Sequence, residues 1–321
     1  MNIPHEAAAF FYFSYPEKET AMETYTKQLN DYEDALDAIF FTLALLTEAI
    51  HEERNRQPPN EEKLGELQQE FDNLMRNRML LQFDDKEAIQ CILNEYTPIL
   101  KNSHTLGILQ YNARPKGVIL PEGLPVTLKD EPIAVIIGGQ PGSGAQVLTS
   151  KAIARLGAGN YVFIDTDELR LFHPKFAWLA REDCQNADKF THEDNRLWAL
   201  RLVHDAIKTG RNIIIKQTLC KSSTMETIAT EMRQAGYRIE MHVMAVSHEM
   251  STLRICQRYE RQRARYGYGR FTSQACHDKA YERLAETLRV VEDKKLVDRL
   301  CIYDISYNLI HENSLENTAC E

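Results

Sequence analysis

The stretch that decides the fold is Gly138-Gly139-Gln140-Pro141-Gly142-Ser143-Gly144-Ala145-Gln146, which directly follows the apolar run Ile133 to Ile137. A strand that leads through such a loop into a helix is typical of a phosphate-binding loop, with the pattern G-x-x-x-x-G-K-[ST]. Gly139 and Gly144 hold its two glycine positions. Glycines are needed because the backbone N–H groups must curl inward around an anion. The sequence therefore predicts a nucleotide-binding loop made of Gly139, Gly142, Ser143, Gly144, Ala145 and Gln146.

Two residues of this loop depart from the pattern. Ala145 replaces the lysine that reaches the β- and γ-phosphates, and Gln146 replaces the hydroxyl that holds Mg²⁺. The backbone cradle and the dipole of the following helix remain available to an anion. The charge and the metal ligand are lost, so we predict no metal-binding residue here.

Short β-rich runs alternate with helical stretches through the rest of the chain. They are Ile133 to Ile137, Tyr161 to Ile164, Asn212 to Ile215, Glu240 to Ala245 and Leu300 to Tyr303. This alternation predicts an α/β fold of the P-loop kinase type, with a doubly wound, mostly parallel sheet. One more short strand is predicted at Val118 to Leu120.

Residues 17–101 have the apolar spacing of amphipathic helices. The first stripe is Leu29, Tyr32, Leu36, Ile39, Phe40, Leu43 and Leu46, the second is Leu64, Leu67, Phe71, Leu74 and Leu81, and the third is Ile89, Ile92 and Leu93. Pro58 and Pro59 separate the first two, and Asn60 is placed to cap the second helix. We predict an acidic helical bundle over 1–105, a connection over 106–131 and a P-loop domain over 132–321.

The net charge of -9 is distributed unevenly. Residues 1–110 hold 20 acidic and 9 basic side chains, which leaves 27 acidic and 29 basic side chains for the remainder. An acidic lobe is not expected to bind nucleic acid and is suited to face a basic surface. Solvated helix faces are the alternative explanation.

The composition is that of a soluble protein, with 43% apolar and 26% charged residues. The apolar stretches are too short to span a bilayer, so no membrane association is expected. No basic segment precedes the aromatic patch at Phe10 to Phe13, which argues against a secretory signal. The 7 cysteines are dispersed, without a Cys-x-x-Cys pair, which predicts a reducing, cytoplasmic location.

The stretch from Ile133 to about Tyr307 resembles the zeta toxin family of bacterial toxin–antitoxin systems. Besides the loop, the matching segments are Ile164-Asp165-Thr166-Asp167, His173-Pro174, Asn195-Arg196, Arg258-Tyr259-Glu260, and Arg270 before Thr272 with His277-Asp278 following. Members phosphorylate a hydroxyl of UDP-N-acetylglucosamine or related nucleotide sugars. The resemblance therefore implies ATP and Mg²⁺ as cofactors and a nucleotide or nucleotide-sugar ligand. Antitoxins of this family are small helical bundles that cover the ATP site, which implies such a partner, separate or intramolecular.

The resemblance also implies roles for single residues. Asp167 stands where the family has its general base, with a structural role at a helix N-terminus as the alternative. Arg258 and Arg270 match arginines that neutralise the transferring phosphates. Arg254, Arg258, Arg261 and Arg265 share one helix face before the Gly-Tyr segment at 266–269. That face is suited to a lid over phosphates, to docking of the acidic lobe, or to solvent.

The predicted substrate-binding residues are Asn195, Arg196, Lys216 and Thr218, and the departures gather among their neighbours. Lys216-Gln217-Thr218 stands where the family has Glu-Gly-Thr, Ala199 replaces another active-site glutamate, and Cys220 replaces a basic residue.

Three functions follow as hypotheses. The favoured one is a pseudokinase derived from a nucleotide-sugar kinase. The second is an active kinase in which Lys216 substitutes for the missing loop lysine. The third is a regulatory or interaction protein in which the N-terminal bundle covers the site.

Overall fold

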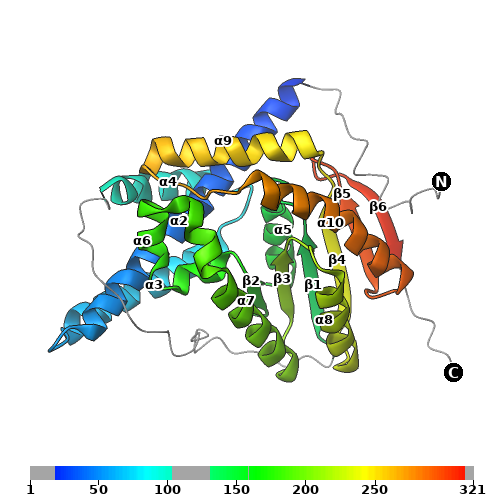
Figure 1. The fold of residues 1–321 in the computed structure, drawn as a ribbon, viewed down its shortest axis with the longest axis horizontal. Helices are drawn as coiled ribbons and strands as arrows, with labels where there is room; N and C mark the ends of the chain where they lie inside the picture. Colours follow the sequence, from blue (N-terminus) through cyan, green and yellow to red (C-terminus); the bar gives the residue numbers. More distant parts are fainter. Residues whose placement is uncertain (1–18, 103–130, 158, 315–321) are drawn as a thin grey trace.

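In this computed structural model of the protein, the described residues are 19–102, 131–157 and 159–314. The strand predicted at Val118 to Leu120 and the aromatic patch at Phe10 to Phe13 lie outside them. Figure 1 shows an α/β unit with three N-terminal helices packed against one side. No helix within the described ranges is long and apolar enough to cross a membrane.

The central sheet has the order β2-β3-β1-β4-β5-β6. The strands are β1 (Ile133–Gly138), β2 (Val162–Asp165), β3 (Ile213–Gln217), β4 (Arg238–Met244), β5 (Arg299–Tyr303) and β6 (Leu309–Ser314). All neighbouring strands pair in parallel except β5 and β6, which are antiparallel. The predicted α/β class and mostly parallel sheet are confirmed. The sequence did not reveal β6, an edge strand that is exposed along much of its length.

Helices follow the strands in the order expected for a doubly wound fold. They are α5 (Gln146–Leu156), the 3₁₀ helix η3 (Glu168–Phe172), α6 (Phe176–Glu182), α7 (Cys184–Lys208), α8 (Ser222–Gln234), α9 (His248–Tyr266) and α10 (Gln274–Asp293). Alternate residues of β1 face opposite sides of the sheet. Ala134 and Ile136 pack with α7, α8 and α10, whereas Val135 and Ile137 pack toward α5, α6 and the N-terminal helices.

The N-terminal region forms α2 (Glu19–Asn55), α3 (Glu61–Leu80) and α4 (Lys86–Asn102). Asn60 caps α3 as predicted, because its side chain accepts a hydrogen bond from the Lys63 N–H at 3.1 Å. The apolar stripe of α2 is buried in the same cluster as Val135 and Ile137 of the sheet. The helices therefore share a hydrophobic core with the α/β unit. In Figure 1, α2 (blue) crosses α9 (yellow), and the two helices contact each other.

Candidate functional site

The phosphate loop has the backbone that its glycines predict. Gly142 and Gly144 adopt φ values of +82° and +84°, which side-chain-bearing residues rarely tolerate. The loop packs directly on α9, since the Ser251 carbonyl oxygen fills the space that a Cβ on Gly142 would need. Gln140 ties the loop to the end of β4, donating through Nε2 to the Val246 carbonyl at 2.7 Å.

The open side of the loop is covered by neighbouring elements. Tyr307 donates a hydrogen bond from its hydroxyl to the Gly144 carbonyl at 2.7 Å. Leu29 of α2 also lies against Gly144. Ala145 is buried, and Gln146 begins α5, where it leaves its side-chain oxygen without a hydrogen-bond partner among the described residues. Neither residue offers the cation or the hydroxyl that a nucleotide–Mg²⁺ complex would need, so Mg²⁺ does not fit this loop.

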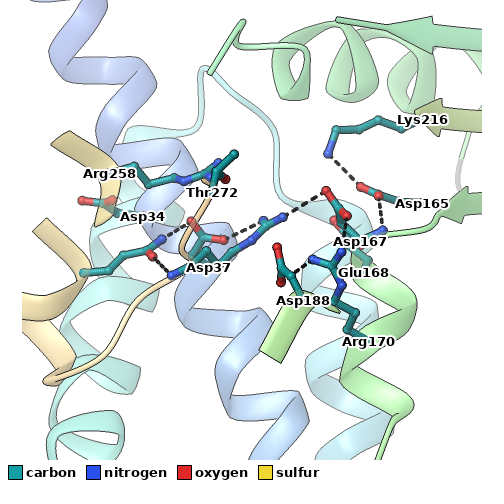
Figure 2. A network of polar contacts seen from close by, with 12 residues as sticks. Asp34, Asp37, Asp165, Asp167, Glu168, Arg170, Asp188, Lys216, Arg258 and Thr272 are labelled. Atoms are coloured by element: carbon teal, nitrogen blue, oxygen red, sulfur yellow. Dashed lines mark hydrogen bonds and ion pairs between the residues drawn. The ribbon is translucent and has the colours of Figure 1, made fainter. Parts of the chain in front are cut away.

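Two aspartates of α2 form ion pairs with arginines of α9 and of the segment after it. Asp34 pairs with Arg261 at 3.2 Å and with Arg265 at 3.1 Å. Asp37 pairs with Arg270 at 3.2 Å (Figure 2). The side chains of Asp34 and Asp37 are only 3% and 7% exposed, so both carboxylates are nearly removed from water. Arg261, Arg265 and Arg270 therefore have carboxylates as their anions.

Arg258 lies in the same cluster without an ion pair of its own in the described part of the chain. Its Nη2 donates to the Thr272 hydroxyl at a long 3.5 Å. Burial and the neighbouring Arg270 lower the pKa of Arg258, whereas Asp37 and Glu33 oppose that change. Burial likewise raises the pKa of Glu33, although Arg258 lowers it. The structure thus places Arg258 near Arg270 and adds acidic side chains from α2.

Asp167, the expected general base, sits just before η3 and makes no side-chain hydrogen bond that caps it. It pairs with Arg170 at 3.1 Å and with Arg270 at 3.3 Å. Burial alone would raise the pKa of Asp167, but the two arginines outweigh it and hold that pKa well below its usual range. A carboxylate with such a low pKa is a weak proton acceptor at neutral pH.

Lys216 extends from the end of β3 to Asp165 at the end of the adjacent strand β2 (Figure 2). The ammonium lies 2.7 Å from the Asp165 carboxylate. Asp165 is 4% exposed and also accepts a hydrogen bond from the Asp167 N–H at 2.9 Å. Lys216 is therefore held in a buried ion pair at the carboxyl ends of β2 and β3. The region between these strand ends, the phosphate loop and the arginines of α9 is called the crevice.

The remaining predicted substrate residues are dispersed. The hydroxyl oxygen of Thr218 lies 3.0 Å from the sulfur of Cys220. Asn195 is fully buried in α7, and neither its amide nitrogen nor its oxygen has a partner among the described residues. Arg196 pairs at 2.6 Å with Glu193 on the exposed side of α7. None of the contacts that the structure gives these residues is with the arginine cluster.

One group within the described ranges has metal-ligand chemistry, formed by His248, His277 and Asp278, whose candidate ligand atoms lie within 4.8 Å of one another. His248 is hydrogen-bonded to Asp278 at 2.7 Å, and His277 is fully buried against Ser251 at 2.8 Å. These contacts join the first turns of α9 and α10. We therefore assign the group a structural role.

The α2 carboxylates are the site residues that sequence reasoning did not single out. Their signal was present, because Asp34 and Asp37 stand inside the apolar stripe of α2, among Ala35, Leu36 and Ala38. Acidic residues are almost never buried unless they are paired. Asp34 meets Arg261 across 227 residues of sequence, which no local pattern reveals.

Comparisons with known proteins agree with this architecture. The Zeta toxin family model matches residues 123–316. Toxin PezT of Streptococcus pneumoniae is 26% identical over 189 residues, 59% of this chain and 74% of PezT. Toxin zeta of Enterococcus hirae is 29% identical over 54% of this chain, and the match spans 61% of that toxin.

The solved structure from the pneumococcal PezAT toxin–antitoxin system superposes with a TM-score of 0.51 at 24% identity. That alignment covers 59% of this chain and 74% of the solved one, and it shows a common fold. The family match extends over more than half of the chain and includes the phosphate loop, the Asp167 segment and the arginines of α9. The chain belongs to the zeta toxin family, the kinase-like toxins of toxin–antitoxin systems.

Proposed function

We propose that this protein is a pseudokinase, a zeta-type fold that no longer transfers phosphate and whose crevice is closed by its own helix α2. The single observation that carries the proposal is the pairing of Asp34 and Asp37 with Arg261, Arg265 and Arg270. Guanidinium groups of this kind bind phosphates and carboxylates with the same donor geometry. The carboxylates of α2 therefore compete with a phosphorylated ligand for the same arginines.

The chemistry of the crevice supports the loss of transfer. Phosphoryl transfer depends on positioned cations that neutralise the reacting phosphate. Ala145 supplies none, and Gln146 cannot replace the metal-binding hydroxyl. Lys216 pairs with Asp165, which argues against its service as the substitute cation. Asp167 is held in a low-pKa state by two arginines, which weakens it as a base.

In this proposal, residues 1–105 act as an intramolecular counterpart of an antitoxin, and residues 132–321 keep the kinase-derived binding surface. The ligand class is a nucleotide or nucleotide sugar that is bound without chemistry. The apolar continuity of α2 with the sheet core supports closure as the resting arrangement.

The test is a phosphotransfer assay with radiolabelled ATP, Mg²⁺ and UDP-N-acetylglucosamine. The protein, an opened Asp34→Ala/Asp37→Ala variant and an Asp31→Ala control would be compared. Asp31 is on the same helix and makes no ion pair with another described residue. We expect no transfer from any of the three proteins.

Phosphate transfer by the opened variant would refute the pseudokinase proposal and favour an active kinase that α2 inhibits. In that event the Lys216→Ala change tests whether Lys216 is the cation that replaces the loop lysine. If Lys216→Ala removes the activity of the opened variant, the substitute-lysine hypothesis holds instead.

A further inference from the structure

Arg254 lies one turn beyond the point where α9 is fixed to the phosphate loop. The Ser251 carbonyl contacts Gly142, and Gln140 reaches the Ser251 hydroxyl at 3.3 Å. Ser251 is fully buried and is also bonded to His277 of α10 at 2.8 Å. The start of α9 is thus held from two sides. The position of Arg254 relative to the loop is consequently set by backbone packing.

The guanidinium of Arg254 is directed at the second glycine of the loop. Its Nη1 lies 3.3 Å from the point where a side chain on Gly144 would begin. Ala145, the residue that replaces the loop lysine, follows immediately in the chain. Helix α9 therefore places a positive charge beside the phosphate loop, although the loop itself contains no basic residue.

The charge of Arg254 is buried. Arg254 is 8% exposed, and both Nη1 and Nη2 lack a hydrogen-bond acceptor among the described residues. Arginines of α9 further along the helix find Asp34, as Arg261 and Arg265 do. Burying an unpaired charge is costly, and an arginine in this state is expected to have an anion as its partner.

The opposing groups near Arg254 do not satisfy it. Glu33 of α2 raises the pKa of Arg254, while burial lowers it. No ion pair joins Glu33 to Arg254 in the described structure. Burial raises the pKa of the Glu33 carboxyl, although Arg258 and Arg254 lower it in part. Tyr25, also nearby, leaves its own hydroxyl without a partner. No described residue therefore accepts a hydrogen bond from either terminal nitrogen of Arg254.

We propose that Arg254 replaces the missing loop lysine, so that the degenerate loop still binds a phosphate group. The loop supplies backbone N–H groups at the start of α5, and Arg254 supplies a planar fork of donors that matches two oxygens of one phosphate. The ligand class is a phosphate monoester or the terminal phosphate of a nucleotide, held without Mg²⁺. This inference rests on the proposed function and extends it, since it names the chemical group that the catalytically inactive crevice binds.

The test is isothermal titration of the full chain with inorganic phosphate and, separately, with ATP in EDTA. Both titrations are repeated in the opened Asp34→Ala/Asp37→Ala background, which removes the ion pairs of α2 with Arg261, Arg265 and Arg270 and so frees the approach to the loop. Arg254→Met keeps the volume but removes the charge, and Arg254→Lys keeps the charge without the fork. Arg263→Met is the matched control, because Arg263 is on the same helix, 53% exposed and paired with Glu260.

We expect phosphate to bind, and to bind more tightly in the opened background. Arg254→Met should weaken it by about tenfold or more, Arg254→Lys by less, and Arg263→Met should have no effect. Equal phosphate affinity in Arg254→Met and the parent would overturn the proposal, as would absence of phosphate binding in the opened background. Circular dichroism confirms that each variant is folded.

These outcomes are separate from those of the phosphotransfer assay. Turnover of ATP with affinity dependent on Arg254 would refute the pseudokinase and keep the phosphate site. If no phosphate is transferred and the affinity for phosphate does not depend on Arg254, the pseudokinase proposal stands and the Arg254 phosphate site is refuted.

Discussion

Replacing Asp37 by asparagine tests whether charge pairing holds α2 over the crevice. The change keeps the size of the side chain and removes its negative charge. Arg270 is 14% exposed and would then keep Asp167 as its only charged partner among those that the structure gives it. Breaking a buried ion pair costs about 3–5 kcal/mol. Because Asp167 is 42% exposed and still compensates Arg270 in part, we expect about 2–3 kcal/mol here.

The assay is hydrogen exchange of the α2 amides in parallel with urea unfolding. A loss of about 2–3 kcal/mol should speed exchange of those amides by roughly 30- to 150-fold, provided that α2 opens as a unit. Asp31→Asn, six positions earlier on α2, serves as the control and should leave exchange unchanged. Unaltered exchange and an unaltered urea midpoint in Asp37→Asn would refute the view that carboxylate–arginine pairs hold the crevice closed.

Three further changes probe other parts of the fold. Asn60→Ala removes the cap of α3 and should lower the free energy of unfolding by about 1 kcal/mol in urea titrations, whereas Asn60→Ser should not. Phe41→Ala removes a ring that is 2% exposed at the junction of α2 with the α/β unit, and should cost about 3–5 kcal/mol by the same titration. The pKa of Glu240 is lowered to about 2, chiefly by its hydrogen bond with His242 and then by Arg155. The charge of Glu240 therefore stabilises the fold above a pH of about 4, and this stabilisation is lost as the pH falls. Glu240→Gln should therefore lower the melting temperature at pH 7. The loss should be equivalent to about 1–2 kcal/mol, because solvent screens the charge of Arg155. The difference in melting temperature from the parent should shrink below a pH of about 4, and a difference independent of pH would contradict this interpretation.

The sheet was largely predictable because its strands carry a strong local signal. In β1, five consecutive residues from Ala134 to Gly138 are buried, and such runs of apolar residues are typical of parallel strands covered on both faces. β6 escaped prediction because Leu309, Ile310 and the polar residues after them have neither a continuous apolar run nor a buried face. Edge strands depend on pairing with a neighbour, which the local sequence does not encode.

The candidate site was predictable only in part. The loop glycines and the arginine spacing on α9 are local features, and both are found together in the structure. The partners of those arginines are not local, since Asp37 and Arg270 are 233 residues apart in sequence. The charge difference between the two parts of the chain was compatible with the acidic lobe facing a basic surface and equally with solvated helix faces. It did not say which acidic residues meet the arginines.

The location of Leu29, Phe40 and Leu43 in the same core as the sheet has a consequence for control. When an inhibitor is a separate protein, inhibition depends on how much of it the cell contains and on how long it survives. In the proposed closure by α2, the blocking helix is part of the chain that it blocks, so its effective concentration would be set by the fold and be the same at every protein concentration. Under this proposal, dilution or the turnover of a second protein would not expose the arginines. Exposure requires a ligand that outcompetes the aspartates, or cleavage of the chain followed by loss of part of its own core.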